Sequence, residues 1–135
     1  MLRANKGRGY VYYLRYHIVW CVKYRNAVLV GDVERDVKEI LREIADEQKI
    51  EILSLETDKD HVHMLISCTP QQTIPSILKS FKGTSARRLF LRHPSLKNAL
   101  WGGHLWNPSY FVATVSDTTE EQIKHYIEHQ QINWK

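Results

Sequence analysis

The segment 60–66, DHVHMLI, alternates two histidines with apolar residues, and this alternation limits the possible folds more than any other feature of the chain. Successive side chains of an extended strand leave opposite faces, so His61 and His63 project together, roughly 6 to 7 Å apart along the backbone. The apolar residues between them face the other way and predict a sheet that helices cover on one side. On the open side the two imidazoles are placed to share one cation.

The remainder of the chain predicts the elements that complete this sheet. Their order is strand, helix, strand, strand, helix, strand, helix, which is that of a split β-α-β sandwich, an α+β fold. We expect an antiparallel four-stranded sheet with two helices on one face, the first strand and the histidine strand being central neighbours. The C-terminal helix is additional to this sandwich, and we expect it to have a separate role. The expected strands are Tyr10 to Val22, Ile50 to Glu56, His61 to Cys68 and Ser109 to Val115. The expected helices begin at Asp32, at Thr73 and at Thr119, the second ending near Leu91, with Gly83 loosening its middle, and the third near Trp134.

Length and composition predict one domain over 1–135, with a core at about 10–115 and the terminal helix at about 118–134. No apolar run reaches the ~20 residues that a membrane span needs, and the N-terminal residues lack the apolar core of a signal peptide. We therefore expect a cytoplasmic protein with no membrane partner. Cys21 and Cys68 are expected to be reduced structural thiols. The formal charge of +4 suits a polyanionic partner.

The last expected helix carries Tyr126 and Gln130, which are four residues apart and therefore share a face. A phenol has a pKa of about 10 and is a poor nucleophile at neutral pH, so a tyrosine that attacks phosphorus needs a nearby cation. Two imidazoles and an amide oxygen would hold a divalent ion, for which Mn²⁺ fits best and Mg²⁺ is also suitable. The competing interpretation makes Tyr126 a half-buried packing residue and Gln130 a surface amide.

Four segments of the chain carry a family resemblance. They are 21–25 (CVKYR), 61–63 (HVH), 101–110 (WGGHLWNPSY) and 126–130 (YIEHQ). In this order they resemble the single-tyrosine HUH transposases of small bacterial and archaeal insertion sequences, the IS200-like family. The resemblance spans nearly the whole chain, and the combination is far more specific than any part of it. It implies a ferredoxin-like or RRM-like sandwich, which agrees with the fold expected from the order of elements.

The resemblance also implies an activity and its partners. Such a transposase cuts and rejoins single-stranded DNA at the ends of its element, and Tyr126 would attack the scissile phosphate to form a 5′-phosphotyrosine and release a 3′-hydroxyl. His61, His63 and Gln130 would be the metal ligands. The family implies a homodimer, commonly with the tyrosine helix of one subunit completing the histidine site of the other. Its substrate is the single-stranded element end, folded into an imperfect hairpin.

Basic and aromatic side chains near these motifs are the candidates for DNA contact. Lys79 and Arg87 face away from the apolar stripe of the second helix and Lys82 flanks it, so we expect all three to be solvated and free to meet phosphate. Unpaired bases can stack on tyrosine. The full set of DNA candidates is Lys6, Arg8, Lys23, Tyr24, Arg25, Lys79, Lys82 and Arg87.

Other classes of protein with paired histidines fit less well. A histidine-triad hydrolase needs a third alternating histidine where this chain has Leu65, and a two-histidine phosphoesterase needs a second His-x-Thr/Ser motif, which is missing. A non-catalytic module that binds single-stranded nucleic acid stays open, because the aromatic and basic residues would suffice for it. A domesticated relative that acts on palindromic genomic repeats stays open as well.

Overall fold

The computed structural model describes residues 5–7, 10–115 and 120–129. The strands are β1 Asn5–Gly7, β2 Tyr10–Tyr12, β3 Arg15–Cys21, β4 Glu51–Asp58, β5 His61–Ser67 and β6 Phe111–Thr114. The helices are α1 Gly31–Gln48, α2 Ile74–Lys79, α3 Ser85–Arg92, α4 Leu96–Ala99 and α5 Glu120–His129. Three short helical turns are η1 Lys23–Arg25, η2 Ser80–Thr84 and η3 Trp101–Gly103. None of the helices in these described ranges could span a bilayer.

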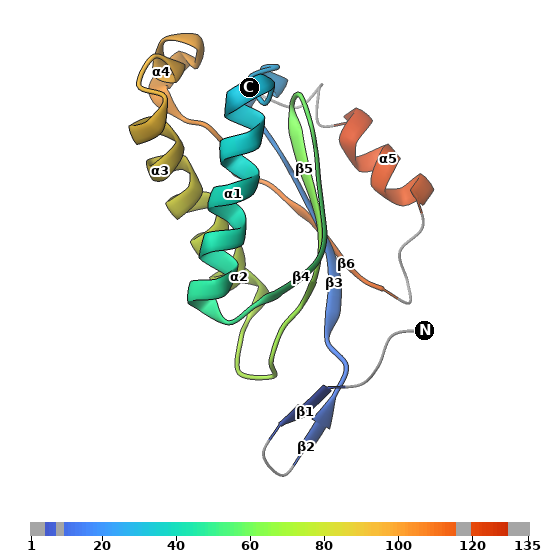
Figure 1. Cartoon of the computed structure of the whole chain (residues 1–135). Coiled ribbons are helices and arrows are strands. Elements are labelled where there is room, and N and C mark those ends of the chain that lie inside the picture. The colour runs from blue at the N-terminus through green and yellow to red at the C-terminus, as the bar shows by residue number, and fades with distance from the viewer. Residues whose placement is uncertain (1–4, 8–9, 116–119, 130–135) are drawn as a thin grey trace.

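The main sheet has the strand order β4-β5-β3-β6 and is antiparallel throughout. Helices α1 and α3 cover one of its faces and α5 lies on the opposite side (Figure 1). This arrangement confirms the predicted α+β sandwich, including the central position of the first strand and the histidine strand. The two central strands therefore carry the histidines into the middle of the sheet.

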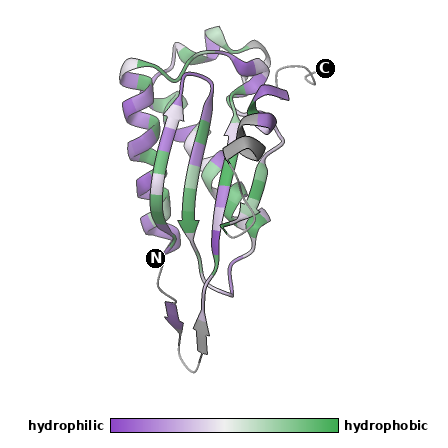
Figure 2. Ribbon diagram, turned by 90° about the vertical axis from the view of Figure 1, so that its right-hand side faces the viewer, coloured by the Kyte–Doolittle hydropathy of each residue, from purple (hydrophilic) through white to green (hydrophobic). Residues whose placement is uncertain are grey.

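The register between β3 and β5 determines which side chains face the helices. Val19 pairs with His63, and Cys21 pairs with His61. Residues of β3 and β5 that point to the helices have essentially no exposure to solvent, and hydrophobic and hydrophilic residues alternate along these strands in Figure 2. The buried side chains on this face are Ile18, Trp20, Val62, Met64 and Ile66.

Helix α1 forms because its apolar residues recur at helical spacing on one side of a charged sequence. Its first residue, Gly31, has φ = 57°, a backbone conformation that favours glycine. The helix thus begins one residue before the predicted Asp32, whose carboxylate lies in the first turn, where it interacts favourably with the helix dipole. Lys49 ends the helix in the left-handed conformation. The buried residues of α1 are Val37, Ile40, Leu41, Ile44 and Ala45.

The second predicted helix is present but is interrupted. Thr73 caps α2 by accepting a hydrogen bond from the Ser76 N–H at 3.3 Å. The π-helical turn η2 then separates α2 from α3 and contains Gly83, the residue expected to loosen the middle of the helix. A π turn has a wider ring than an α turn and occurs often at functional sites. This turn carries Lys82, whose contacts are described below.

The first predicted strand is two strands rather than one. β3 ends its ladder with β5 where Arg15 meets Ser67, and the Cys68 N–H donates a further hydrogen bond of 3.1 Å to the Leu14 carbonyl. The chain bends after Tyr12, and β2 pairs instead with β1 as a small antiparallel ribbon beyond the sheet (Figure 1). A single long strand was therefore a wrong prediction, because the alternation of the sequence does not say where the partner strand stops.

Three aromatic residues connect the sheet, the second helix and the segment that precedes β6. The ring of Trp20 stacks on Phe81 with centroids 6.3 Å apart and meets the edge of Trp106 at 5.7 Å. The indole N–H of Trp106 donates a hydrogen bond of 2.9 Å to Ser85 Oγ inside the core. This buried bond fixes the segment before β6 against α3.

Replacing Ser85 by Ala should lower the free energy of unfolding by about 1 to 3 kcal/mol, because the indole N–H of Trp106 is left buried without an acceptor. Urea unfolding followed by far-UV circular dichroism would measure it. Ser76→Ala, at an exposed position of α2, is the matched control and should be nearly neutral. Equal stability of the two variants would contradict the role given to this bond.

Candidate active site

Three histidines gather on the sheet face opposite α1 and α3. His17 of β3 lies diagonally across from His63 of β5, and its Nδ1 is 3.2 Å from Nε2 of His63. The two ring centroids are 5.4 Å apart, and His61 projects from the same face one step along β5. Sequence reasoning missed His17. Its position follows only from the register of two strands that lie far apart in the chain.

Burial favours the neutral form of two of these imidazoles by lowering their pKa. The pKa of His17 is lowered from its usual value because the ring is partly removed from water. The pKa of His63 is lowered by the same cause and, secondly, by the neighbouring His17. A neutral imidazole has a free nitrogen lone pair, which is the form that binds a metal ion.

Asp60 orients His61 from the turn between β4 and β5. Its Oδ1 lies 2.9 Å from Nδ1 of His61, and its Oδ2 accepts from Nε of Arg25 at 2.9 Å. With Nδ1 donating to the carboxylate, Nε2 of His61 is left as the free ligand atom, which is the usual arrangement behind a metal-binding histidine. Asp60 is thus both a residue of the turn and the side chain that orients His61.

Tyr126 of α5 stands over β6. Its ring packs against Phe111 with centroids 5.4 Å apart, and its hydroxyl lies 3.2 Å from Ser109 Oγ. Phe111 pairs with Val19, which pairs in turn with His63, so Tyr126 and the histidines share one face of the sheet. Burial raises the pKa of Tyr126 to about 12, against a smaller opposing effect of the bond to Ser109.

The hydrogen-bond pattern around Ser109 determines the direction of the Tyr126 proton. Asn107 Oδ1 accepts from the Ser109 N–H at 2.8 Å and from Ser109 Oγ at 2.9 Å. Because the serine proton is used toward Asn107, the phenol donates its own proton to Ser109 Oγ. On ionisation the serine proton can turn to the phenolate, which explains why this bond lowers the pKa of Tyr126.

Lys82 differs from the expectation that it is solvated. Its ammonium is half-buried and donates to the carbonyls of Asn107 and Ser109 at 2.6 and 3.0 Å. Burial lowers the pKa of Lys82 to about 8. The π turn directs this side chain inward, so Lys82 supports the loop that carries Ser109 instead of standing free for phosphate.

The remaining DNA candidates fall into three groups. Lys6, Lys79 and Arg87 are exposed, as expected. Tyr24 is 38% exposed, with Lys23 Nζ 5.6 Å from its ring centroid. Arg25 is directed inward to Asp60, which differs from the expected solvated side chain. Arg8 and the predicted metal ligand Gln130 lie outside the described residues.

The donor set agrees with a divalent ion. His61 and His63 project from the same face of β5, and the hydrogen bond from His61 to Asp60 leaves Nε2 of His61 free to bind an ion. His17 Nδ1, which lies 3.2 Å from His63 Nε2, is a hydrogen-bond partner of His63. Within the described ranges no three His, Cys, Asp or Glu side chains are arranged to hold an ion. A complete site therefore needs a further donor, such as the amide oxygen expected from Gln130.

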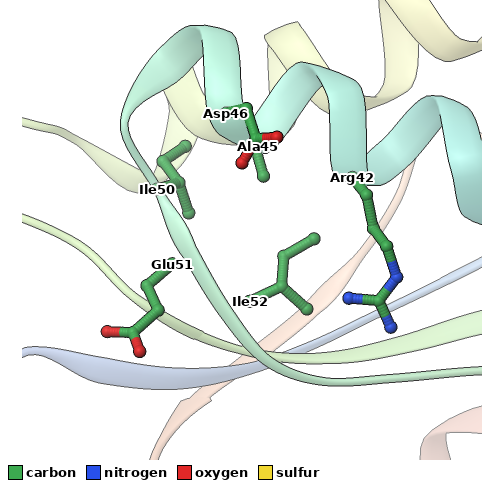
Figure 3. Close-up of a pocket in the computed structure, with 6 residues that line it drawn as sticks. All are labelled: Arg42, Ala45, Asp46, Ile50, Glu51 and Ile52. Carbon is green, nitrogen blue, oxygen red and sulfur yellow. The ribbon is translucent and has the colours of Figure 1, made fainter.

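The hollow in Figure 3 is separate from this site. It lies between the end of α1 and the start of β4 and is lined by Arg42, Ala45, Asp46, Ile50, Glu51 and Ile52. Ile52 pairs with Ile66, whose side chain faces the helices, so the hollow lies at the helix side of an edge strand. The histidines and Tyr126 occupy the other face.

A protein-family model described as Transposase IS200 like matches residues 10–130. The chain belongs to this family. This IS200-like transposase is 57% identical over 129 residues to the ISDra2 transposase TnpA of Deinococcus radiodurans, covering 96% of this chain and 92% of the relative. It is 34% identical over 116 residues to the transposase for insertion sequence element IS200 of Salmonella typhimurium, covering 86% and 76% of the two chains. The resemblance seen in the four sequence motifs is thereby confirmed.

Solved structures show the same fold. A crystal structure of a Deinococcus radiodurans protein described as a transposase superposes with a TM-score of 0.88 at 53% identity, covering 93% of this IS200-like transposase and 97% of the other chain. The structure of a REP-associated tyrosine transposase bound to a REP hairpin gives a TM-score of 0.56 at 14% identity, with coverages of 98% and 76%. The second likeness shows the fold alone.

The lowered pKa of Lys82 predicts a pH dependence of stability. Between pH 8 and the unfolded lysine pKa of about 10.4, Lys82 binds more protons in the unfolded chain than in the folded one. Lys82 should therefore make the free energy of unfolding increase as the pH rises through this window. Lys82→Met should remove this gain, and Lys79→Met, exposed on α2, should keep it. Urea unfolding at several pH values would measure the slopes. Parallel slopes in the wild type and Lys82→Met would rule the effect out.

Proposed function

We propose that this IS200-like transposase cuts and rejoins single-stranded DNA at the ends of its insertion sequence through a 5′-phosphotyrosine on Tyr126. The observation that carries the proposal is the shared sheet face of Tyr126 and the three histidines, His17, His61 and His63. A nucleophile and a set of metal-binding nitrogens are the two components that attack on a phosphodiester requires. Family membership supports the same reaction.

The covalent step exchanges one phosphate ester for another. The oxygen of Tyr126 bonds to phosphorus, the bond from phosphorus to the 3′ oxygen breaks, and that oxygen leaves as a 3′-hydroxyl while the phenol gives up its proton. With a pKa of about 12 the phenol is protonated at neutral pH, so its oxygen needs positive charge nearby. Mn²⁺ or Mg²⁺, held by His61, His63 and Gln130 with His17 beside them, would supply this charge and polarise the phosphate.

The side chains around Tyr126 prepare it for this step. Ser109 accepts the phenol proton in a hydrogen bond and so directs the lone pairs of the phenol oxygen away from the loop. Phe111 fixes the plane of the ring. Lys82 holds the carbonyls of the loop and keeps Ser109 in place. The stored phosphotyrosine allows a 3′-hydroxyl to reverse the reaction, which rejoins DNA without ATP.

We further propose that the substrate is an end folded into an imperfect hairpin and that the protein acts as a homodimer. The hairpin in the complex of the REP-associated tyrosine transposase, which has the same fold, agrees with such a ligand. In the single chain α5 packs on its own sheet through Tyr126 and Phe111. In a dimer that exchanges α5 between subunits, these contacts and that of Arg25 with the Ile127 carbonyl would form between the two chains, and each histidine site would be completed by the tyrosine of the other chain.

Incubation with single-stranded hairpins from the flanks of the gene and Mn²⁺ should yield a covalent protein–DNA adduct, visible on a denaturing gel. Tyr126→Phe should abolish it while hairpin affinity is retained, because only the nucleophilic oxygen is lost. Tyr110→Phe, an exposed phenol near β6, is the control and should keep the adduct. EDTA should abolish it too. Tight binding with no adduct on any hairpin would favour a non-catalytic binding module. Full activity of Tyr126→Phe would show that Tyr126 is not the nucleophile.

The metal ligands can be separated by Mn²⁺ titration of the free protein, followed by electron paramagnetic resonance. Gln130→Ala and His17→Ala should each weaken Mn²⁺ binding by about 10- to 100-fold, as the loss of a ligand or of its support does. His125→Ala, an exposed histidine of α5, should leave the titration unchanged. Unchanged affinity in His17→Ala would leave His17 as a hydrogen-bond partner of His63 alone.

A further inference from the structure

We propose that Arg25 is a positioning residue that holds the tyrosine helix in register with the histidine strand. Its Nε and Nη2 lie 2.9 and 2.8 Å from Asp60 Oδ2, and its Nη1 donates to the backbone carbonyl of Ile127. The other oxygen of Asp60 contacts Nδ1 of His61 at 2.9 Å. Three consecutive contacts thus connect the imidazole of His61, a proposed metal ligand, to Ile127, the residue that follows Tyr126. The catalytic meaning of this connection rests on the proposed function of Tyr126.

The charges in this connection are largely removed from water. The side chain of Arg25 is 16% exposed and that of Asp60 is 10% exposed. A buried ion pair of this kind is sensitive to the loss of either partner, because the remaining charge is left without compensation. One carboxylate oxygen of Asp60 contacts Arg25 and the other contacts His61. A substitution at Arg25 therefore affects the imidazole of His61 through Asp60.

The chemistry of arginine suits this position better than that of lysine. A guanidinium is planar and presents donors on two sides, so one edge can meet Asp60 while the other end reaches α5. Its acceptor on α5 is the backbone carbonyl of Ile127. A lysine ammonium is a point charge on a flexible stem and would not hold both partners in fixed geometry.

The backbone of the turn is shaped to direct Arg25 inward. Tyr24 and Arg25 have φ values of 58° and 54°, in the left-handed region that residues with a Cβ rarely adopt. The turn is held by hydrogen bonds from the Val22 N–H to the Asp60 carbonyl and from the Lys23 N–H to the Leu105 carbonyl, both 2.8 Å long. Such strain persists where surrounding contacts over-determine it, and it is concentrated at functional sites.

A phosphate contact is the competing role for Arg25, and salt dependence separates the two. Each lysine or arginine that neutralises a DNA phosphate adds about 0.7 to 0.9 to the slope of log affinity against log salt. A residue that only positions α5 adds nothing to this slope. It affects instead the opening of α5 and the rate of adduct formation.

Hydrogen exchange of the free protein, without DNA or metal, tests the connection independently of any activity. In Arg25→Gln and Arg25→Lys the amides of 120–129 should exchange about 10- to 100-fold faster, the change expected on losing a hydrogen bond to a charged group. Arg25→Lys keeps the charge and the stem, so it separates loss of geometry from loss of charge. Lys23→Gln removes a cation from the same turn and should leave exchange in α5 unchanged. Unchanged exchange in both Arg25 variants would overturn the proposal.

Single-turnover adduct formation and hairpin affinity at several salt concentrations complete the test. Both Arg25 variants should slow adduct formation while leaving affinity and its salt slope unchanged. Asp60→Asn, which keeps the shape of the side chain, should accelerate exchange in α5 as well, and Arg25→Gln should add little in that background. A salt slope reduced by about 1, with normal exchange in α5, would make Arg25 a DNA contact and refute the positioning role. If the wild type forms no adduct, the proposed function fails while the exchange result still decides the role of Arg25.

Discussion

The antiparallel pairing of β3 with β5 is the constraint on which the rest of the molecule depends. The register in which Val19 pairs with His63 puts side chains such as Trp20 and Met64 under the helices and the histidines on the other face. A slip of one residue in either strand would exchange the two faces and bury imidazoles in the core. A single register thus specifies both the core and the candidate site, and a shift in this register would disrupt both.

The sequence predicted what is local. Alternation in 60–66 and the apolar periodicity of α1 indicated the histidine strand, the first helix and the sandwich, and the fold comparison bears the sandwich out. Tyr126 could be singled out because its motif lies within one helical turn. His17 and Arg25 could not be assigned their contacts, since each depends on a partner more than thirty positions away. The π turn was only hinted at by one glycine.

Two cations support the proposed site, and they differ in how they tolerate burial. Arg25 is paired with a carboxylate and, as a guanidinium, stays charged. Lys82 donates to two carbonyl oxygens and has no carboxylate partner among the described residues, and burial lowers its pKa to about 8. Arg25 therefore keeps its positive charge, whereas Lys82 loses its proton at moderately alkaline pH.

The contacts that build the site join distant parts of the chain. His17 and His63 are 46 positions apart, and Arg25 and Ile127 are 102 positions apart. Contacts this distant in sequence form late and slowly in folding, because the intervening chain must be ordered first. A nascent chain on the ribosome carries its histidines long before its tyrosine helix exists. On the proposed mechanism, incomplete products of translation would therefore be unable to break DNA, because a fragment released early lacks Tyr126.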